Sequence, residues 1–356
     1  MLFVLQCYEK NGIYATCGDK NCTFARCYFD GAKIIRNFER IYIYIAAMEI
    51  IKCHGSGNDF IMVDTTRDAR LQHVDWSAFA RIASDREHGI GSDGILLVVR
   101  HDDGIYGMDM LNPDGTHAEM CGNGIRCVAR LAYERGYVAT GILRSGGRDY
   151  RIARAEDIAE GIPAFKVDIP IRTHSDDFAF YRAGESFVGR IIEGLHPSLR
   201  FTALNLGNPH IVAEVETIDL ALLSALGERV KGARELFPHG VNVSLYERRE
   251  GGIFVATYER GAGITLSCGT AMTASATAAA LLGIVNAGER IEVSNRGGRV
   301  YCTTRTEPVL TTTLEGNATY EWTGRAEFAG GEFMFEILTN TGEAELWLDF
   351  VRSINR

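Results

Sequence analysis

Two stretches that each open with cysteine and glycine decide the fold: Cys121-Gly-Asn-Gly-Ile-Arg-Cys-Val-Ala-Arg-Leu-Ala-Tyr133 and Cys268-Gly-Thr-Ala-Met-Thr-Ala-Ser-Ala-Thr-Ala-Ala-Ala280. In both, apolar residues recur with the period of a helix, and a glycine follows that can end it, Gly136 or Gly283. The predicted apolar stripes are Ile125, Val128, Ala129, Ala132 and Tyr133 in the first helix and Met272, Ala276, Ala279 and Ala280 in the second. The sequence therefore predicts a cysteine at the N-terminus of each of two helices.

The residues before each cysteine also repeat. Asn112 and Glu259 each lie nine residues before their cysteine, at the ends of the strand-like runs 108–112 and 254–260. Further upstream, Gly57-Asn58 matches Gly207-Asn208, and Gly91-Ser92-Asp93-Gly94 matches Gly240-Val241-Asn242. Self-similarity of this kind indicates a duplicated structural unit. Each half is predicted to contain several strands and one central helix.

This placement of two cysteines has a chemical consequence. Backbone N–H groups at a helix N-terminus lack partners and carry the positive end of the helix dipole, so we expect them to lower the pKa of a nearby thiol and to attract carboxylates. If the two halves face one another, two thiols lie on opposite sides of one anion site. An amino acid held there by its α-carboxylate could lose its α-proton to one sulfur and receive a proton from the other. Such an inversion needs no pyridoxal cofactor, and no cofactor or metal is expected.

A structural explanation of the cysteines competes with this one, because free cysteine is commonly a small buried hydrophobe. One Cys-Gly pair alone favours that explanation. The repeated pair, with polar residues at matched offsets, favours a functional role for Cys121 and Cys268. Cys127 lies beside the predicted apolar stripe and is expected in the core, and Cys53 and Cys302 lie in strand-like runs and receive no role.

The composition favours a small-molecule function. The chain has 356 residues, 46% of them hydrophobic, and a formal net charge of -9 with interspersed charges, which disfavours a nucleic-acid partner. No run of about 18 apolar residues predicts a membrane span. Nine cysteines form an odd number in a large chain, so reduced thiols in the cytoplasm are expected rather than a disulfide framework.

The first 47 residues differ from the rest, since they hold four cysteines without clear periodicity. They are predicted to be an appendage, and we expect translation to begin at Met48, which opens a strand leading into a glycine turn. The spacing of Cys17, Cys22 and Cys27 matches no common zinc pattern. The intact mass of the protein from its native source tests the expected start.

From about Met48 to Gly324 the chain resembles diaminopimelate epimerases. The segments that carry the resemblance are His54-Gly-Ser-Gly-Asn-Asp-Phe60, Asp85-Arg-Glu-His-Gly-Ile-Gly91, Asn112-Pro-Asp-Gly115, Glu119-Met-Cys-Gly-Asn-Gly-Ile-Arg126, Gly207-Asn-Pro-His210 and Glu259-Arg-Gly-Ala-Gly263. The resemblance implies an α/β (α+β) fold with two pseudo-symmetric domains, each a curled, mostly antiparallel sheet around a central helix, with the active site in the interdomain cleft. We expect the first domain to comprise residues 48–166 and about 318–356, and the second residues 167–317.

The resemblance also implies roles for individual residues. It makes Cys121 and Cys268 the two bases, supported by His210 and Glu259. The backbone N–H groups that hold the α-carboxylate would come from Gly122, Asn123, Gly269 and Thr270. Substrate-binding side chains would be Asn58, Asn112, Asn208, Asn242, Glu259 and Arg260. Arg260 and the amides suit a substrate with a second ammonium and carboxylate. A homodimer is expected from the family.

Two features of the sequence depart from the family pattern, and two rival functions compete with the epimerase. Ala271 stands where the family commonly has glycine, and the tail after about Gly324 is longer than usual. One rival is a two-cysteine racemase of another amino acid, such as histidine or proline. The other is a non-catalytic amino-acid binding or redox-sensing protein whose facing cysteines form a disulfide. Glu259 and His210 argue against the second rival, because such a switch does not need them.

Overall fold

The computed structural model describes residues 13–14, 25–26, 46–118, 120–138, 141–173, 176–181, 185–329 and 332–354. The chain divides into two units, Met1–Ile45 and Ala46–Arg356. In the first unit, β1 (Ile13–Tyr14) pairs antiparallel with β2 (Ala25–Arg26). Most of the predicted appendage, residues 1–47, lies outside the described residues.

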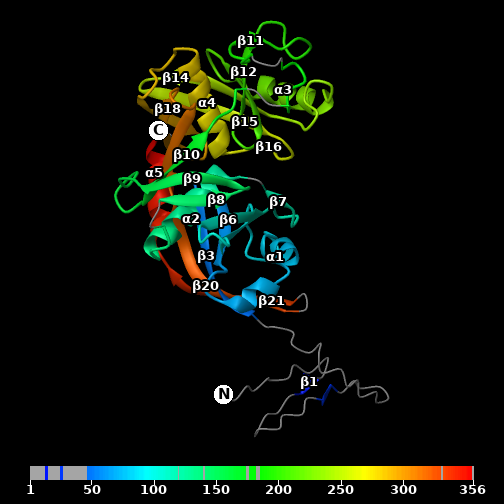
Figure 1. The fold of residues 1–356 in the computed structure, drawn as a ribbon, viewed down its shortest axis with the longest axis vertical. Coiled ribbons are helices and arrows are strands. Elements are labelled where there is room, and N and C mark those ends of the chain that lie inside the picture. The colour runs from blue at the N-terminus through cyan, green and yellow to red at the C-terminus, as the bar shows by residue number, and fades with distance from the viewer. Residues whose placement is uncertain are drawn as a thin grey trace. The chain divides into compact units, whose positions relative to one another are not determined.

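The second unit is a mixed α/β fold built from two extended sheets that share one strand (Figure 1). Along the first sheet the strands run β21, β20, β3, β4, β5, β6, β8 and β9, and β7 pairs with the edge of β6. Their bounds are β3 (Ala46–Gly55), β4 (Asn58–Asp64), β5 (Ile95–Arg100), β6 (Tyr106–Leu111), β7 (His117–Ala118), β8 (Ile142–Ser145), β9 (Arg148–Arg154), β20 (Thr319–Ala329) and β21 (Glu332–Asn340).

The second sheet runs from β9 through β10, β19, β18, β17, β15, β14, β13 and β12 to β11, and β16 pairs with β15. Its strands are β10 (Ala164–Pro170), β11 (Arg190–Ile191), β12 (Arg200–Asn205), β13 (Pro209–Glu214), β14 (Asn242–Arg249), β15 (Gly252–Glu259), β16 (Gly263–Ile264), β17 (Arg290–Asn295), β18 (Gly298–Arg305) and β19 (Thr311–Asn317). The helices are η1 (Ala69–His73), α1 (Trp76–Ala83), α2 (Gly122–Glu134), α3 (Leu220–Gly232), α4 (Gly269–Leu281) and α5 (Glu343–Ile354).

The connectivity of the two sheets repeats. In the first, β3 pairs antiparallel with β4, β4 parallel with β5, β5 antiparallel with β6, and β6 parallel with β8. In the second, β12 to β15 and β17 follow the same sequence of pairings. Helix α1 lies between β4 and β5, as α3 lies between β13 and β14. Helix α2 precedes β8, as α4 precedes β17. The mixed α/β fold class is confirmed, whereas the division into two domains near residues 166 and 317 stays a prediction.

Each sheet curls around one helix, α2 in the first and α4 in the second (Figure 1). Each helix has thirteen residues, of which eleven are buried. The prediction of a single apolar stripe is therefore wrong, because both helices are enclosed on almost every side. Tyr133, assigned to the stripe, is 58% exposed, whereas Arg126 is completely buried. In α4 the hydroxyls of Thr273, Ser275 and Thr277 donate to carbonyls one turn earlier, and the Thr277 hydroxyl also contacts that of Thr312 on β19 at 2.7 Å.

The C-terminal segment joins the first sheet and then packs as α5. Strand β20 pairs with β3 over its length, and β21 lies outside β20. Trp347 and Phe350 of α5 are buried with Ile162, and the Trp347 ring lies 5.3 Å from the ring of His54 on β3. The tail beyond Gly324 thus completes the first sheet.

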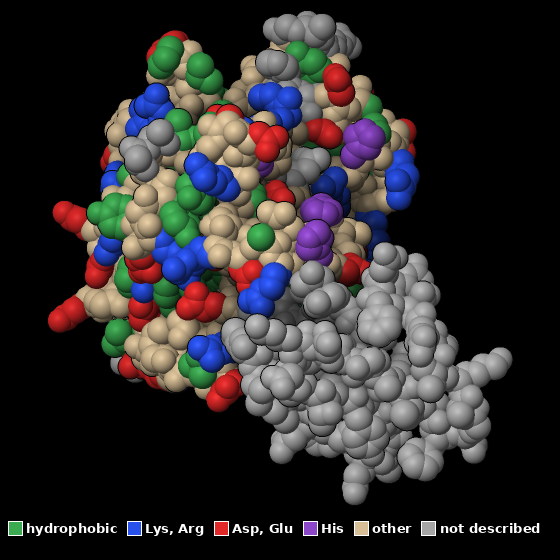
Figure 2. All heavy atoms as spheres, turned by 60° about the horizontal axis from the view of Figure 1, so that its bottom comes forward, with side chains coloured by type: hydrophobic (Ala, Val, Ile, Leu, Met, Phe, Trp, Pro, Cys, Tyr) green, Lys and Arg blue, Asp and Glu red, His purple; other side chains and the backbone are tan. Residues whose placement is uncertain are grey.

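On the face drawn in Figure 2, basic and acidic side chains are interspersed, as the sequence predicts. Among the described residues, no helix is both long enough and apolar enough to cross a membrane.

Candidate active site

Cys121 is the N-cap residue of α2. Its backbone is extended, and its sulfur accepts the N–H of Gly124 at 3.4 Å, as a capping side chain does. The carboxamide oxygen of Asn58 lies 3.7 Å from the same sulfur and 3.3 Å from the Nδ2 of Asn123. The sequence-predicted residues Cys121, Asn58 and Asn123 therefore form one polar cluster at the start of α2.

Cys268 occupies the equivalent N-cap position of α4. Its backbone angles, φ -131° and ψ 110°, nearly equal the -133° and 115° of Cys121. Its sulfur lies 3.4 Å from the hydroxyl of Thr270, whose oxygen accepts from Asn208 Nδ2 at 3.4 Å. Ala271, which stands where the resemblance leads one to expect glycine, is buried, and its N–H acts to lower the pKa of the Cys268 thiol. The Ala271 departure thus preserves this donor.

The two helix starts meet directly. A methyl group added to Gly122 would lie 3.8 Å from the backbone nitrogen of Thr270, and one added to Gly269 would lie 2.8 Å from Asn123 Oδ1. Gly269 is therefore needed for the helices to approach this closely, whereas a methyl group on Gly122 would only touch the other helix and would crowd the end of the Leu314 side chain at 3.0 Å instead. The unpaired N–H groups of two first turns consequently lie around one small region, and this geometry suits an anion.

The predicted direction of the thiol pKa shifts is wrong in this structure. Burial raises the pKa of Cys121 to about 11, and it raises the pKa of Cys268 well above its ordinary value. For Cys121, the N–H groups of Gly124 and Asn123 act in the predicted, lowering direction, but desolvation outweighs them. For Cys268, the nearby Glu259 carboxylate adds to the increase.

His210 and Asn208 adjoin the Cys268 cluster. The Nε2 atom of His210 lies 3.0 Å from Asn208 Oδ1, and Asn208 in turn contacts Thr270. His210 is completely buried, and burial lowers its pKa to about 3, so its ring is neutral near pH 7. Its Nδ1 atom has no hydrogen-bond partner among the described residues.

Glu259, Arg260 and Asn242 form the outer part of this half. Glu259 accepts a hydrogen bond from Thr265 Oγ1 at 2.5 Å, and burial raises its pKa. Asn242 is buried and fixed by two backbone groups, since its oxygen accepts the N–H of Arg260 at 2.9 Å and its nitrogen donates to the Pro209 carbonyl at 3.2 Å. The exposed Arg260 side chain donates to the carbonyl of His239 at 2.6 Å.

Asn112 is the predicted residue that the structure does not join to the others. Its Nδ2 donates to Thr116 Oγ1 at 3.0 Å, and its N–H donates to the Thr116 carbonyl, so among the described residues its hydrogen bonds stay within its own turn. Glu259, at the matching position of the other half, instead adjoins the second cysteine.

Asp93 belongs to the site but has no role in the sequence prediction. Its carboxylate accepts from Asn58 Nδ2 at 2.7 Å and from Arg86 at 2.8 Å, and Arg86 also pairs with Asp59. Asp93 thereby fixes the carboxamide that faces Cys121. The signal was present in the repeat, because the segment containing Asp93 matches the one containing Asn242.

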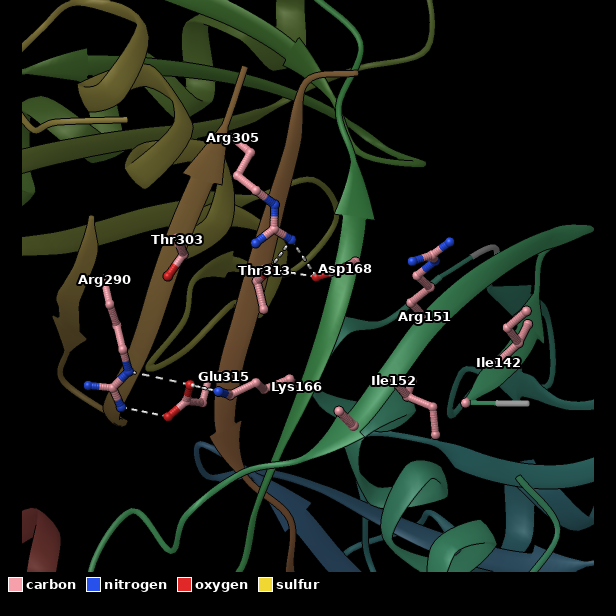
Figure 3. A pocket seen from close by; sticks show the side chains of 12 residues that line it. Ile142, Arg151, Ile152, Lys166, Asp168, Arg290, Thr303, Arg305, Thr313 and Glu315 are labelled. Carbon is pink, nitrogen blue, oxygen red and sulfur yellow. Dashed lines mark hydrogen bonds and ion pairs between the residues drawn. The ribbon is translucent and has the colours of Figure 1, made fainter. Parts of the chain in front are cut away.

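A groove of about 650 Å³ lies elsewhere, on β9, β10, β17, β18 and β19 (Figure 3). Its charged side chains largely pair with one another: Arg305 with Asp168 at 3.2 Å, and both Lys166 and Arg290 with Glu315. None of the predicted site residues lines it. The groove therefore has no part in the site around the two cysteines.

Known proteins of one family resemble this chain. The family model described as diaminopimelate epimerase matches residues 50–149 and 202–321, more than half of the chain. The chain belongs to the diaminopimelate epimerase family. It is thus an isomerase of the epimerase type, and the two matched ranges contain every predicted site residue.

Curated members of the family resemble the chain over most of its length. The diaminopimelate epimerase of Clostridium acetobutylicum is 34% identical over 288 residues, covering 80% of this chain and 85% of that protein. The diaminopimelate epimerase of Ligilactobacillus salivarius is 34% identical over 325 residues, covering 87% and 100%. An amino-acid substrate and a place in the lysine pathway fit this family.

Solved structures support the fold alone. A hydroxyproline epimerase from Agrobacterium vitis matches with a TM-score of 0.55 and 14% identity, covering 80% of this chain and 92% of that one. A PhzF-family phenazine biosynthesis protein from Bacillus anthracis matches with the same TM-score and 16% identity, covering 78% and 98%.

Proposed function

We propose that the protein interconverts LL- and meso-2,6-diaminopimelate, with Cys121 and Cys268 as the two acid-base groups and without an organic cofactor. The observation that carries the proposal is the pair of N-cap cysteines on two helices whose first turns abut at Gly122 and Gly269. The names of the relatives support this choice of substrate. The product would serve lysine and peptidoglycan precursor synthesis.

In this mechanism the substrate α-carboxylate binds the N–H groups of Gly122, Asn123, Gly269 and Thr270. One sulfur, as thiolate, removes the α-proton, and the opposite thiol delivers its own proton to the other face of the carbon. The two sulfurs thereby exchange protonation states as the stereocentre inverts. Fixed N–H donors stabilise the negative charge that develops on the carboxylate in the transition state, and such donors need no reorganisation during the reaction.

Burial contributes to the same step. A buried thiol has a raised pKa, so its thiolate is rarer but more basic than an exposed one. A strong base suits the α-proton of an amino acid, which is a weak acid. Glu259 and His210 complete the second half by holding Cys268, Asn208 and Thr270 in place.

The remaining residues would recognise the distal end of the substrate. The exposed guanidinium of Arg260 would pair with the second carboxylate, and the amides of Asn58, Asn112, Asn208 and Asn242 would bind polar atoms of both ends. A histidine or proline racemase would not need this distal recognition. The proposal also includes a homodimer in the cytoplasm. Measurements of molecular size in solution test the dimer.

The deciding experiment incubates the reduced protein with LL-diaminopimelate in deuterium oxide. We expect deuterium at the α-carbon and formation of the meso isomer, measured by mass spectrometry and chiral chromatography. The control is a variant carrying both Cys121→Ser and Cys268→Ser, which should show neither. Exchange of another amino acid but not of diaminopimelate would overturn the substrate, and no exchange with any amino acid would overturn the epimerase.

A further inference from the structure

Arg126 is a buried charge without an acidic partner. Three cations are buried among the described residues: Lys52, Arg126 and Arg130. Lys52 pairs with Asp59 and Arg130 pairs with Glu343, whereas Arg126 forms no ion pair in the described part of the chain. In the part of the chain that the structure describes, it is also the largest side chain that is fully buried. Since burying an uncompensated charge is costly, its presence calls for an explanation.

All the hydrogen-bond acceptors of Arg126 are neutral. Its guanidinium donates to the Gly122 carbonyl at 2.9 Å, to Asn123 Oδ1 at 2.9 Å, to Ser56 Oγ at 3.1 Å and to the Asn317 carbonyl at 3.2 Å. Two of these acceptors belong to the residues directly after Cys121. Because the guanidinium occupies Asn123 Oδ1, the Asn123 Nδ2 is left to donate to Asn58, which faces the sulfur.

The surrounding strands leave space for this group. A methyl group on Gly55 of β3 would lie 2.9 Å from Nη2, and one on Gly316 of β19 would lie 3.1 Å from Cζ. The guanidinium therefore lies where the first and second sheets meet, behind the first turn of α2. The fold holds a positive charge there and seals it from water.

We propose that Arg126 is a positioning residue whose fixed charge is balanced by the negative charge that the reaction places at Cys121 and at the carboxylate site. The inference rests on the proposed function for the identity of that anion. The electrostatics agree with it. Against the larger effect of burial, Arg126 acts with the N–H groups of Gly124 and Asn123 to lower the pKa of Cys121. Burial lowers the pKa of Arg126 itself to about 10, so it stays protonated near neutral pH.

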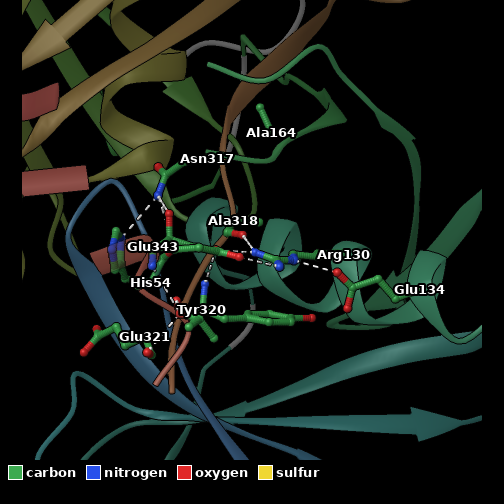
Figure 4. Close-up of polar contacts among 12 residues, drawn as sticks. His54, Arg130, Glu134, Ala164, Asn317, Ala318, Tyr320, Glu321 and Glu343 are labelled. Carbon is green, nitrogen blue, oxygen red and sulfur yellow. Dashed lines mark hydrogen bonds and ion pairs between the residues drawn. The ribbon is translucent and has the colours of Figure 1, made fainter. Parts of the chain in front are cut away.

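Arg130 provides a matched comparison on the same helix, one turn later. Its guanidinium pairs with both oxygens of Glu343, at 2.6 and 2.7 Å, and lies over the ring of Tyr320 at 3.7 Å (Figure 4). Glu343 also accepts the N–H of Tyr320 at 2.9 Å. The charge of Arg130 is neutralised where it lies, and its contacts hold α5 against α2 and β20.

The test measures how fast iodoacetamide labels Cys121 at pH 8 in the full-length protein, with peptide mapping by mass spectrometry to separate it from the other cysteines. We expect Arg126→Gln to slow labelling about tenfold or more, because losing a nearby positive charge raises a thiol pKa by about 1 unit or more. Arg130→Gln should stay within about twofold of wild type. Loosened packing alone would expose the thiol and speed its labelling, the opposite sign. A folded Arg126→Gln variant that labels at or above the wild-type rate overturns the proposal.

A second variant, Arg126→Lys, decides the question even where Arg126→Gln does not fold. Lysine keeps the charge at neutral pH, but burial lowers its pKa into the measurable range. Labelling of Cys121 should then match wild type near pH 7 and rise less than tenfold per pH unit while the lysine loses its proton. A profile parallel to wild type at every pH would overturn the charge effect. Labelling needs no substrate, so these outcomes are independent of whether diaminopimelate is turned over.

Discussion

The starts of α2 and α4 have nearly the same backbone conformation, but the side chains around their cysteines differ. Both cysteines occupy the N-cap position of thirteen-residue helices with eleven buried residues, and their backbone angles agree within about 5°, although only the Cys121 sulfur accepts a capping hydrogen bond. Around Cys121 lie the carboxamide of Asn58 and the buried cation Arg126, whereas around Cys268 lie the Thr270 hydroxyl and the carboxyl group of Glu259, whose charge also acts on Cys121. Helix α4 contains no charged residue. The duplicated fold thus supplies two equivalent positions, and the side chains give the two sulfurs different charge surroundings.

The largest expected effect comes from removing either sulfur. Cys121→Ser and Cys268→Ser should each lower kcat for diaminopimelate epimerisation by about 10³-fold or more, because a serine hydroxyl is a much weaker acid than a thiol. Meso product formation, followed by chiral chromatography, checks this. Since both sulfurs act in one step, the double variant should be little worse than either single one. If one of the single variants kept kcat within tenfold of wild type, only the other thiol would be required for the reaction.

The next effect compares Glu259 with Asn112, which occupy matching positions of the repeat. Glu259→Gln should lower kcat/KM about 10²-fold, because Glu259 adjoins Cys268 and its charge affects that thiol. Asn112→Ala should lower kcat/KM less, about tenfold, because the hydrogen bonds of Asn112 in this structure stay within its own turn. Steady-state kinetics of both variants give the ranking. A larger loss of kcat/KM in Asn112→Ala than in Glu259→Gln would mean that the residue assisting proton transfer lies in the first half of the repeat.

The sequence predicts the local parts of this comparison well. Both N-cap cysteines and both helix ends were correct, because Cys-Gly starts and Gly136 or Gly283 stops are encoded within a few residues. The repeat also predicts which segments meet. It brings Asn58 to Cys121 and Asn208 to Thr270, although the two turns lie far from the helices in sequence.

What the sequence could not predict depends on enclosure by distant strands. Arg126 and Tyr133 lie on one helix, and residue type alone would bury the tyrosine rather than the arginine. Gly55 and Gly316 leave space for the Arg126 guanidinium, and no local sequence pattern predicts that these distant glycines lie beside it. The counter-ion of Arg130 is Glu343, 213 residues away. The direction of the thiol pKa shifts likewise depends on burial by both sheets, which a helix-end rule does not include.

A smaller effect tests the contact between the helix starts. In Gly269→Ala the new methyl would lie 2.8 Å from Asn123 Oδ1, which Arg126 holds, whereas in Gly122→Ala it would meet the end of the Leu314 side chain at 3.0 Å. Because a leucine methyl can rotate away and the fixed amide cannot, Gly269→Ala should raise KM for diaminopimelate about tenfold and Gly122→Ala clearly less. Equal effects would show that the two glycines are equally constrained.

The smallest effect concerns stability, and it compares two buried histidines, His54 of the first sheet and His210 of the second. Burial lowers the pKa of His54 to about 4 and that of His210 to about 3. In the unfolded chain both bind a proton below about pH 6.5. Below that pH the unfolded state gains protons that the folded state refuses, so stability is complete above pH 6.5 and falls with acid.

Each histidine should therefore lower the free energy of unfolding by about 1.4 kcal/mol per pH unit between pH 6 and 5. Urea unfolding at pH 7, 6 and 5 should show His54→Gln and His210→Gln each flattening that slope by about this amount. Below about pH 4 the two differ, because His54 then gains its proton in the folded state while His210 stays neutral to about pH 3. A wild-type slope that neither substitution changes would mean that other groups control the acid stability of both sheets.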